Sequence, residues 1–197
     1  MFPQTLETDR LRLEAARPES VDLDACYQVC SADPGIDTVT NHVTWDPHQT
    51  KRETEVFLAD CHDRWEAREG AEYVIRPRAD EPGAGEIAGF CGMEIDWDTA
   101  TATLGIWLRK RFWGRGYSGE RAEALMRVAF DTLDLSIVAV SHHPENENSR
   151  RAIERYIERF GGRREGRLRN TLEFADGTVH DEVRYTIAQH EWREAVQ

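Results

Sequence analysis

Lysine is scarce in this chain, and acidic residues far outnumber basic ones. Only Lys51 and Lys110 are lysines, and 37 acidic residues against 25 lysines and arginines give a formal net charge of −12. Such an acidic surface repels phosphate backbones, so we expect no nucleic-acid partner. The excess of acidic residues has two possible explanations. One is a hydrated, halophile-like surface suited to high salt, and the other is attraction for a basic partner. The low lysine content favours the first.

The sequence also lacks long apolar runs and cysteine pairs with the spacing of a metal-binding site. No run of about 18 apolar residues is present, which predicts no membrane-spanning helix and no membrane partner. The first residues lack the basic and apolar segments of a signal peptide, so we expect a cytoplasmic protein. Cysteines occur without the spacing and partners of a metal site, and we expect small buried hydrophobes without metal or disulfide. They are Cys26, Cys30, Cys61 and Cys91.

The length and the apolar pattern indicate one domain over residues 1–197. A hydrophobic content of 40% in 197 residues is enough for one sizeable core. Alternating or continuous apolar runs predict strands at 11–15, 72–76, 87–97, 101–109, 136–140, 163–174 and 178–188. Helical spacing predicts helices at 18–31, after Thr50, after residue 116 and from about residue 148. The run at 136–140 is typical of a buried parallel strand.

A glycine-rich segment, Arg111–Glu120, connects a predicted strand to a strongly amphipathic helix. Such a turn leaves backbone N–H groups unpaired, and the helix dipole adds positive potential there, which predicts a phosphate or diphosphate site. Gly114, Gly116 and Gly119 match the dinucleotide-binding pattern. However, the next strand ends at residues 141–143 without the carboxylate that would hold a ribose. A nicotinamide-dependent enzyme is therefore disfavoured.

The same segment resembles the acyl-CoA loop of the GNAT N-acetyltransferases. Its signature, Gln/Arg-x-x-Gly-x-Gly/Ala, is filled by Arg111, Gly114 and Gly116. The WGxGY form at residues 113–117 resembles the RimJ/RimL-like branch, from which Gly119 departs at a cost of about 1 kcal/mol in the helix. The element order and the Asn-x-x-Ser element at 146–149 also resemble this branch. The resemblance implies an α/β (α+β) GNAT fold. Its central sheet is mixed and mostly antiparallel, with about seven strands and about four helices on both faces.

The resemblance implies an acetyl-CoA-dependent N-acetyltransferase that uses no metal. An acetyl group would move directly, in a ternary complex, to a primary amine, either a protein N-terminal α-amine or a small amine. In this resemblance Asn146 positions the cofactor and Ser149 assists the departing thiolate, although either residue alone is more typical of a helix cap. A non-catalytic acyl-CoA-binding module on the same fold is the alternative. The implied cofactor-binding residues are Ile106, Leu108, Arg111, Gly114, Arg115, Gly116, Tyr117, Ser118, Asn146 and Ser149.

The acceptor amine must be neutral before it attacks. An α-amine, with a pKa near 7.7–8.0, needs only a weak base, whereas lysine titrates near 10.4. Glu94, beside the strand expected to hold the thioester, is the candidate base and joins Ser149 as a candidate catalytic residue. A solvated strand position is the alternative for Glu94. His142, after the strand at 136–140, is also near the expected site, but a histidine beside another histidine is more typical of a surface or packing residue. The sequence leaves the acceptor and the oligomeric state open and allows a homodimer. The acceptor cleft is expected to involve Asn41, His42, Trp45 and Asp46.

Overall fold

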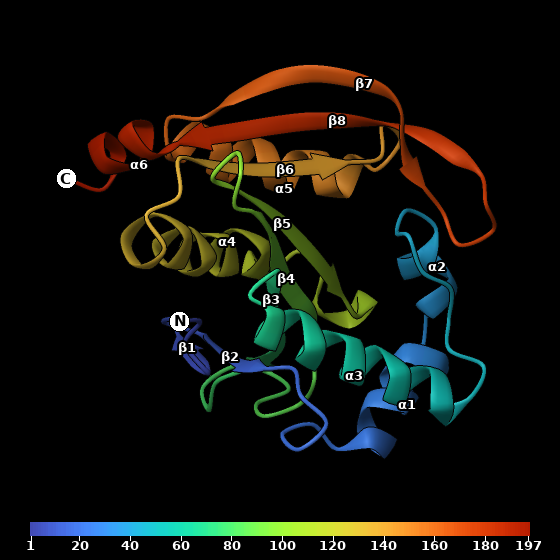
Figure 1. The fold of residues 1–197 in the computed structure, drawn as a ribbon. Helices are drawn as coiled ribbons and strands as arrows, with labels where there is room; N and C mark the ends of the chain where they lie inside the picture. Colours follow the sequence, from blue (N-terminus) through green and yellow to red (C-terminus); the bar gives the residue numbers. More distant parts are fainter.

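A computed structural model describes all 197 residues, whose strands form a single eight-stranded sheet (Figure 1). The strand order is β1-β2-β3-β4-β5-β6-β8-β7, and every neighbouring pair is antiparallel except β5 with β6. This confirms the expected mixed, mostly antiparallel sheet. The strands are β1 Thr5–Glu7, β2 Leu11–Ala15, β3 Gly70–Pro77, β4 Gly89–Asp96, β5 Thr101–Leu108, β6 Ile137–His142, β7 Arg163–Glu173 and β8 Val179–Ala188.

Helices cover both faces of the sheet. Their bounds are α1 Leu23–Ser31, α2 Ile36–Thr40, α3 Lys51–Ala67, α4 Tyr117–Arg127, α5 Glu147–Arg159 and α6 Gln189–Ala195, with a 3₁₀ turn at Lys110–Phe112 and a π-helical turn at Val128–Thr132. The sequence pattern does not predict β1, α2 or α6, because each is too short to show a period. None of the helices is both long and apolar enough to cross a membrane.

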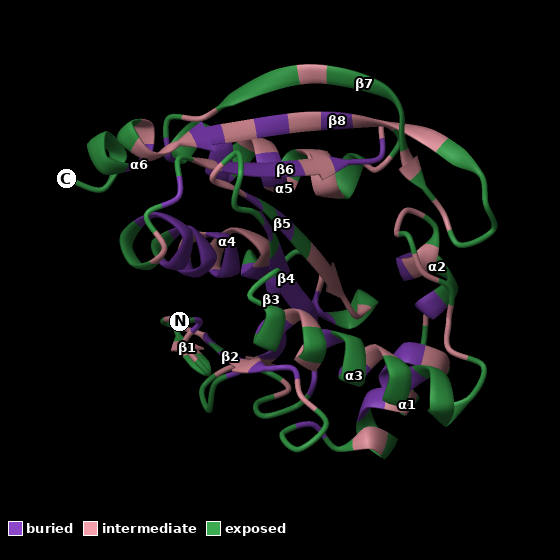
Figure 2. Cartoon of the chain, in the orientation of Figure 1, coloured by how far each residue is buried: buried purple, intermediate pink, exposed green.

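Two apolar cores lie on the two faces of the sheet, and Figure 2 shows the buried strands between them. Alternate residues of β4 divide between the cores, since Phe90 packs with α1 and α3 while Met93 packs with α4. The four cysteines are all buried and free, which confirms the expectation that they are small buried hydrophobes. The cores hold β5 and β6 in place at the centre of the molecule.

Local caps explain where the main helices begin. The Thr50 hydroxyl accepts the Glu53 N–H and donates to its carboxylate at 2.9 Å, which confirms the predicted start of α3. The Asp22 carboxylate accepts the Ala25 N–H at 2.7 Å and so caps α1. By contrast, α4 begins at a glycine, Gly116, whose missing side chain leaves the helix end uncapped. That open end faces the gap described next.

Candidate active site

The two parallel strands β5 and β6 separate along their length and open a cleft between them. They pair from Thr101↔Ile137 to Leu104↔Val140, and beyond that point both strands continue without pairing to each other. The cleft has a volume of about 1130 Å³ and runs from the glycine-rich loop and α5 to α2. Carboxyl ends of parallel strands are common positions for ligands in α/β sheets.

The glycine-rich loop presents a run of unpaired backbone N–H groups to this cleft. Gly114 and Gly116 have φ angles of 76° and 81°, in the left-handed region that residues with side chains rarely adopt. The N–H groups of residues 114–118 donate to no acceptor of the protein. Because α4 has no side-chain cap, the positive end of its dipole is open at the same place. This arrangement suits a diphosphate.

An ion pair holds the loop against the N-terminal strands. The Arg10 guanidinium donates to the Glu120 carboxylate at 2.8 Å and to the Arg115 carbonyl at 2.8 Å. Glu120 also accepts the Thr8 hydroxyl at 2.6 Å. Although burial acts in the opposite direction, hydrogen bonds from Thr8 and Arg10 lower the pKa of Glu120. The loop geometry therefore depends on residues far away in the sequence.

Several predicted cofactor-binding residues use their side chains to support the loop. The guanidinium groups of Arg111 and Arg115 lie over the Phe112 ring, at 4.6 and 4.9 Å from its centroid. Arg111 forms an ion pair with Glu86 outside the cleft and is not among the lining residues. The buried Tyr117 hydroxyl donates to the Glu81 carboxylate at 2.7 Å. Arg115 and Tyr117 therefore present backbone N–H groups to a ligand.

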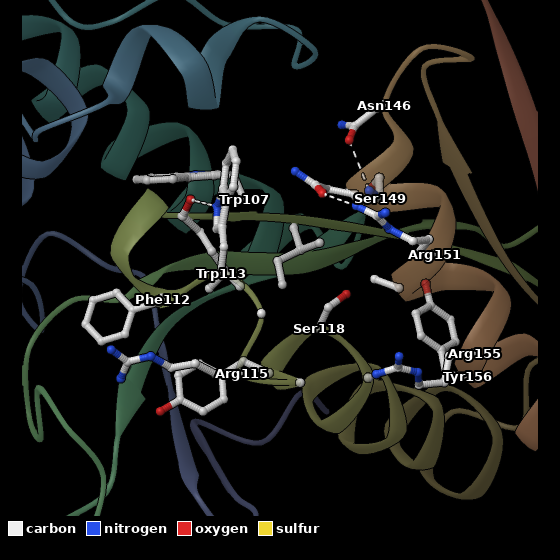
Figure 3. A pocket seen from close by; sticks show the side chains of 18 of the residues that line it. Trp107, Phe112, Trp113, Arg115, Ser118, Asn146, Ser149, Arg151, Arg155 and Tyr156 are labelled. Carbon is white, nitrogen blue, oxygen red and sulfur yellow. Dashed lines mark hydrogen bonds between the residues drawn. The ribbon is translucent and has the colours of Figure 1, made fainter.

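The start of α5 forms the opposite wall of the cleft. The Asn146 side-chain oxygen accepts the Ser149 N–H at 3.0 Å, so Asn146 is the N-cap of α5 (Figure 3). Asn146 and Ser149 both line the cleft, together with Ile106 and Leu108 from β5. The structure thus brings most of the predicted cofactor-binding residues into one cavity. Asn146 therefore both caps α5 and lines the cleft.

Tyr156 contributes to the site a hydroxyl that no sequence motif indicates. It lies two helical turns after Ser149, so both residues lie on one side of α5. Its hydroxyl is buried without a hydrogen-bond partner and, in Figure 3, points into the cleft near Ser118. Burial raises the pKa of Tyr156, against the opposing effect of Arg121, so the hydroxyl keeps its proton at neutral pH.

A row of arginines extends the site along α5. Arg151, Arg155 and Arg159 recur every four residues and all line the cleft, which the helical period could have indicated. Arg151 donates to Asn148 at 2.8 Å and Arg159 pairs with Glu123 at 3.0 Å. Arg155 has no ion-pair partner within 4 Å in the protein. In a chain with a net charge of −12, such a row suits a phosphate group in addition to the diphosphate at the loop.

Aromatic residues and α2 form the other end of the cleft. Trp107 lines it and stacks on Phe90 with centroids 5.4 Å apart. Of the residues expected on the acceptor side, Asn41 and His42 line the cleft. Trp45 packs against Trp107, with ring centroids 5.0 Å apart. Asp46 is not among the lining residues.

The Glu94 carboxylate and the His142 imidazole, the two candidate bases, both lie outside the cleft lining. The Glu94 side chain is 74% exposed and lies 3.4 Å from the Arg64 guanidinium. His142 is buried, with Nδ1 2.8 Å from the His143 carbonyl and Nε2 3.4 Å from the Tyr185 hydroxyl. Both ring nitrogens of His142 are therefore engaged. No group of three or more His, Cys, Asp or Glu side chains is arranged to hold a metal ion.

Known proteins share this sequence pattern and this fold. Residues 10–156 match the family described as Acetyltransferase (GNAT) domain. A protein of Bacillus subtilis (strain 168), which carries the provisional name ribosomal N-acetyltransferase YdaF, is 34% identical over 106 residues. That match covers 52% of this chain and 55% of the relative, so it spans about half of each.

Two solved structures with bound ligands have the same fold. RimL, described as a ribosomal L7/L12 alpha-N-protein acetyltransferase in complex with coenzyme A, has a TM-score of 0.78 and 20% identity, over 93% of this chain and 97% of that chain. The microcin C7 self-immunity acetyltransferase MccE, in complex with acetyl-CoA and AMP, has a TM-score of 0.80 and 17% identity, over 95% and 97%. At these identities the likeness establishes the fold alone.

Proposed function

The chain belongs to the GNAT acetyltransferase family, and from this membership we propose that it transfers an acetyl group from acetyl-CoA to a primary amine within a ternary complex. One observation carries the proposal. The unpaired N–H groups of residues 114–118 lie at the open end of α4, beside the gap between β5 and β6. An anion-binding loop next to a cleft is what a thioester on a long diphosphate-bearing carrier requires.

The proposed cofactor placement follows the lining of the cleft. The diphosphate of acetyl-CoA accepts hydrogen bonds from the loop, and its 3′-phosphate lies near Arg155 on α5. The pantetheine arm runs between β5 and the start of α5, past Ile106 and Asn146. The thioester then lies near Ser149, where the two strands diverge. Such a ligand fits here because the N–H groups of residues 114–118 and the buried Tyr156 hydroxyl on α5 lack protein partners.

The chemistry requires a neutral amine and an exit for the thiolate. The amine nitrogen attacks the thioester carbonyl, the carbon–sulfur bond breaks and the sulfur takes up a proton. A thiol pKa near 8.5 makes this departure easy, so positioning supplies much of the rate. Ser149 and the protonated Tyr156 hydroxyl are the proposed donors to the sulfur. Their presence disfavours a non-catalytic module.

A protein N-terminal α-amine is the proposed acceptor class. The names of the Bacillus subtilis relative and of RimL refer to ribosomal proteins, and RimL is named for an α-amine. Such an amine is already partly neutral at pH 7 and needs only a weak base, which is consistent with the position of Glu94 outside the cleft lining. The opening beside α2 admits a flexible chain end.

The proposal is tested with purified protein by two measurements. Calorimetry compares the binding of acetyl-CoA with that of NAD, and thiol release is followed with N-terminal peptides, polyamines and amino acids as acceptors. We expect acetyl-CoA alone to bind and an N-terminal peptide to give the fastest thiol release. Absence of acetyl-CoA binding refutes the cofactor assignment, whereas binding without release above background for any amine leaves the non-catalytic module.

A further inference from the structure

Four rings from three separate segments form a cluster at the acceptor end of the cleft. His42 follows α2, His143 follows β6, and Phe174 and His180 belong to the β7–β8 hairpin, whose tip lies near α2 in Figure 1. His42 and His143 stack with centroids 5.0 Å apart and planes 18° apart. His143 meets His180 edge to face at 5.0 Å, and Phe174 lies 4.4 Å from His180.

A directional chain of hydrogen bonds fixes the tautomers of two of these histidines. The Glu145 N–H donates to His143 Nδ1 at 3.2 Å, so in the neutral ring the proton is on Nε2. That nitrogen lies 3.3 Å from His180 Nδ1, which therefore accepts. His180 Nε2 then donates to the Thr178 hydroxyl at 2.9 Å, and Thr178 donates to the Asp176 carboxylate at 2.6 Å. Every nitrogen of His143 and His180 is engaged.

His42 differs from its neighbours because its nitrogens are free of protein partners. Its Nδ1 is buried without a hydrogen bond, and the residue lines the cleft beside Asn41. Its stacking partner, His143, directly follows the strand from which β5 diverges. The stack therefore fixes the His42 ring in the lining of the same cleft that Ser149 lines.

We infer that His42 is the base of the proposed reaction, held in place by the His143–His180–Thr178–Asp176 chain. This inference rests on the proposed function. The acceptor ammonium loses a proton to a His42 ring nitrogen, and the free amine attacks the carbonyl carbon. A carbon–nitrogen bond forms, the carbon–sulfur bond breaks, and the sulfur takes a proton from the Ser149 or Tyr156 hydroxyl. The second nitrogen proton then replaces the proton that this hydroxyl gave up. His42 then returns its proton to water, which balances the one proton that the net reaction releases.

The surroundings of the stack favour the neutral form of the His143 ring. Burial, followed by the proximity of His42, His180 and His142, lowers the pKa of His143, and Glu145 is the opposing charge. A neutral His143 allows His42 to carry the transferred proton without a second cation stacked on it. Among the histidines, only His42 combines a ring nitrogen without a protein partner with a position in the cleft lining.

The test uses a variant that keeps the ring and removes both nitrogens. His42→Phe retains the stack, so we expect acetyl-CoA affinity to be unchanged and kcat/KM at pH 7 to fall about 100-fold. Above about pH 9 an α-amine is already neutral, so the rates of the variant and the wild type should converge. Wild-type rates for His42→Phe at pH 7, or a deficit that is constant with pH, would overturn the inference.

Further variants separate catalysis from folding. His190→Phe changes an exposed histidine on α6, outside the cleft, and should match the wild type. His42→Gln should repeat the loss and the convergence with a polar side chain of similar size. Thr178→Val interrupts the chain and should lower kcat about 5-fold without changing KM, since it acts through His143. A wild type that does not bind acetyl-CoA would instead refute the proposed function.

Discussion

The two ends of the cleft are built in different ways. The cofactor end is made of backbone N–H groups from one short loop and of side chains on one face of α5. The acceptor end is made of side chains from the segment after α2, the end of β6 and the β7–β8 hairpin. A backbone site tolerates most changes of side chain except those that alter glycine φ angles. A site of distant side chains changes with any one of its segments, so the acceptor end is where specificity can vary.

The largest effect should come from placing a side chain in the backbone site. Gly116→Glu introduces a negative charge at the diphosphate position, in a backbone conformation unsuited to a side chain. We expect acetyl-CoA affinity, measured by calorimetry, to fall more than about 100-fold. Gly85→Glu is the matched control, because Gly85 has a φ of 77° but lies outside the cleft. Equal affinities for the two variants would place the diphosphate elsewhere.

The next effect separates turnover from binding along the α5 wall. Ser149→Ala removes a proposed donor to the sulfur, so kcat should fall about 10-fold while acetyl-CoA affinity stays within about 2-fold. Ser118→Ala, which faces the same cavity from α4, should weaken affinity and leave kcat nearly unchanged. Parallel losses in kcat and affinity for Ser149→Ala would reduce Ser149 to a binding group.

A smaller effect should test the arginine row. Arg155→Met should weaken CoA about 5-fold but leave dephospho-CoA, which lacks the 3′-phosphate, nearly unaffected. The control is Arg193→Met on α6, outside the cleft. If Arg155→Met weakens both ligands equally, Arg155 does not recognise that phosphate.

The smallest effect concerns the stability of the fold and involves Glu72, a β3 residue outside the cleft lining. Burial raises the pKa of Glu72 to about 7, while Arg64 and Arg121 oppose this. A folded pKa above the ordinary value means that this contribution to stability is present below about pH 4.5 and is lost as pH rises through 7. Glu72→Gln should therefore raise the free energy of unfolding by about 1–3 kcal/mol at pH 8 and by little at pH 5.

Urea denaturation at both pH values measures this difference. Glu69→Gln, an exposed neighbour without such burial, should change stability at neither pH. The same gain at pH 5 and pH 8 would contradict a titrating Glu72.

The contrast between the two ends also explains what the sequence could predict. The parallel strand at 136–140, the start of α3 and the open N–H groups of the loop depend on local pattern, and all three predictions are confirmed. The loop support by Arg10 and the cluster around His143 depend on contacts between distant segments, which no period reveals. The role of Tyr156 in the cleft has no local sequence signal, because a tyrosine on a helix face is equally typical of a core residue. The site roles of Ser149 and Glu94 stay predictions.

A crystal structure of the complex with CoA tests the central claim most directly. The account predicts diphosphate oxygens within hydrogen-bonding distance of the N–H groups of residues 114–118, with the sulfur near Ser149 between the separated ends of β5 and β6. A diphosphate bound away from this loop, with those N–H groups left to solvent, would contradict it.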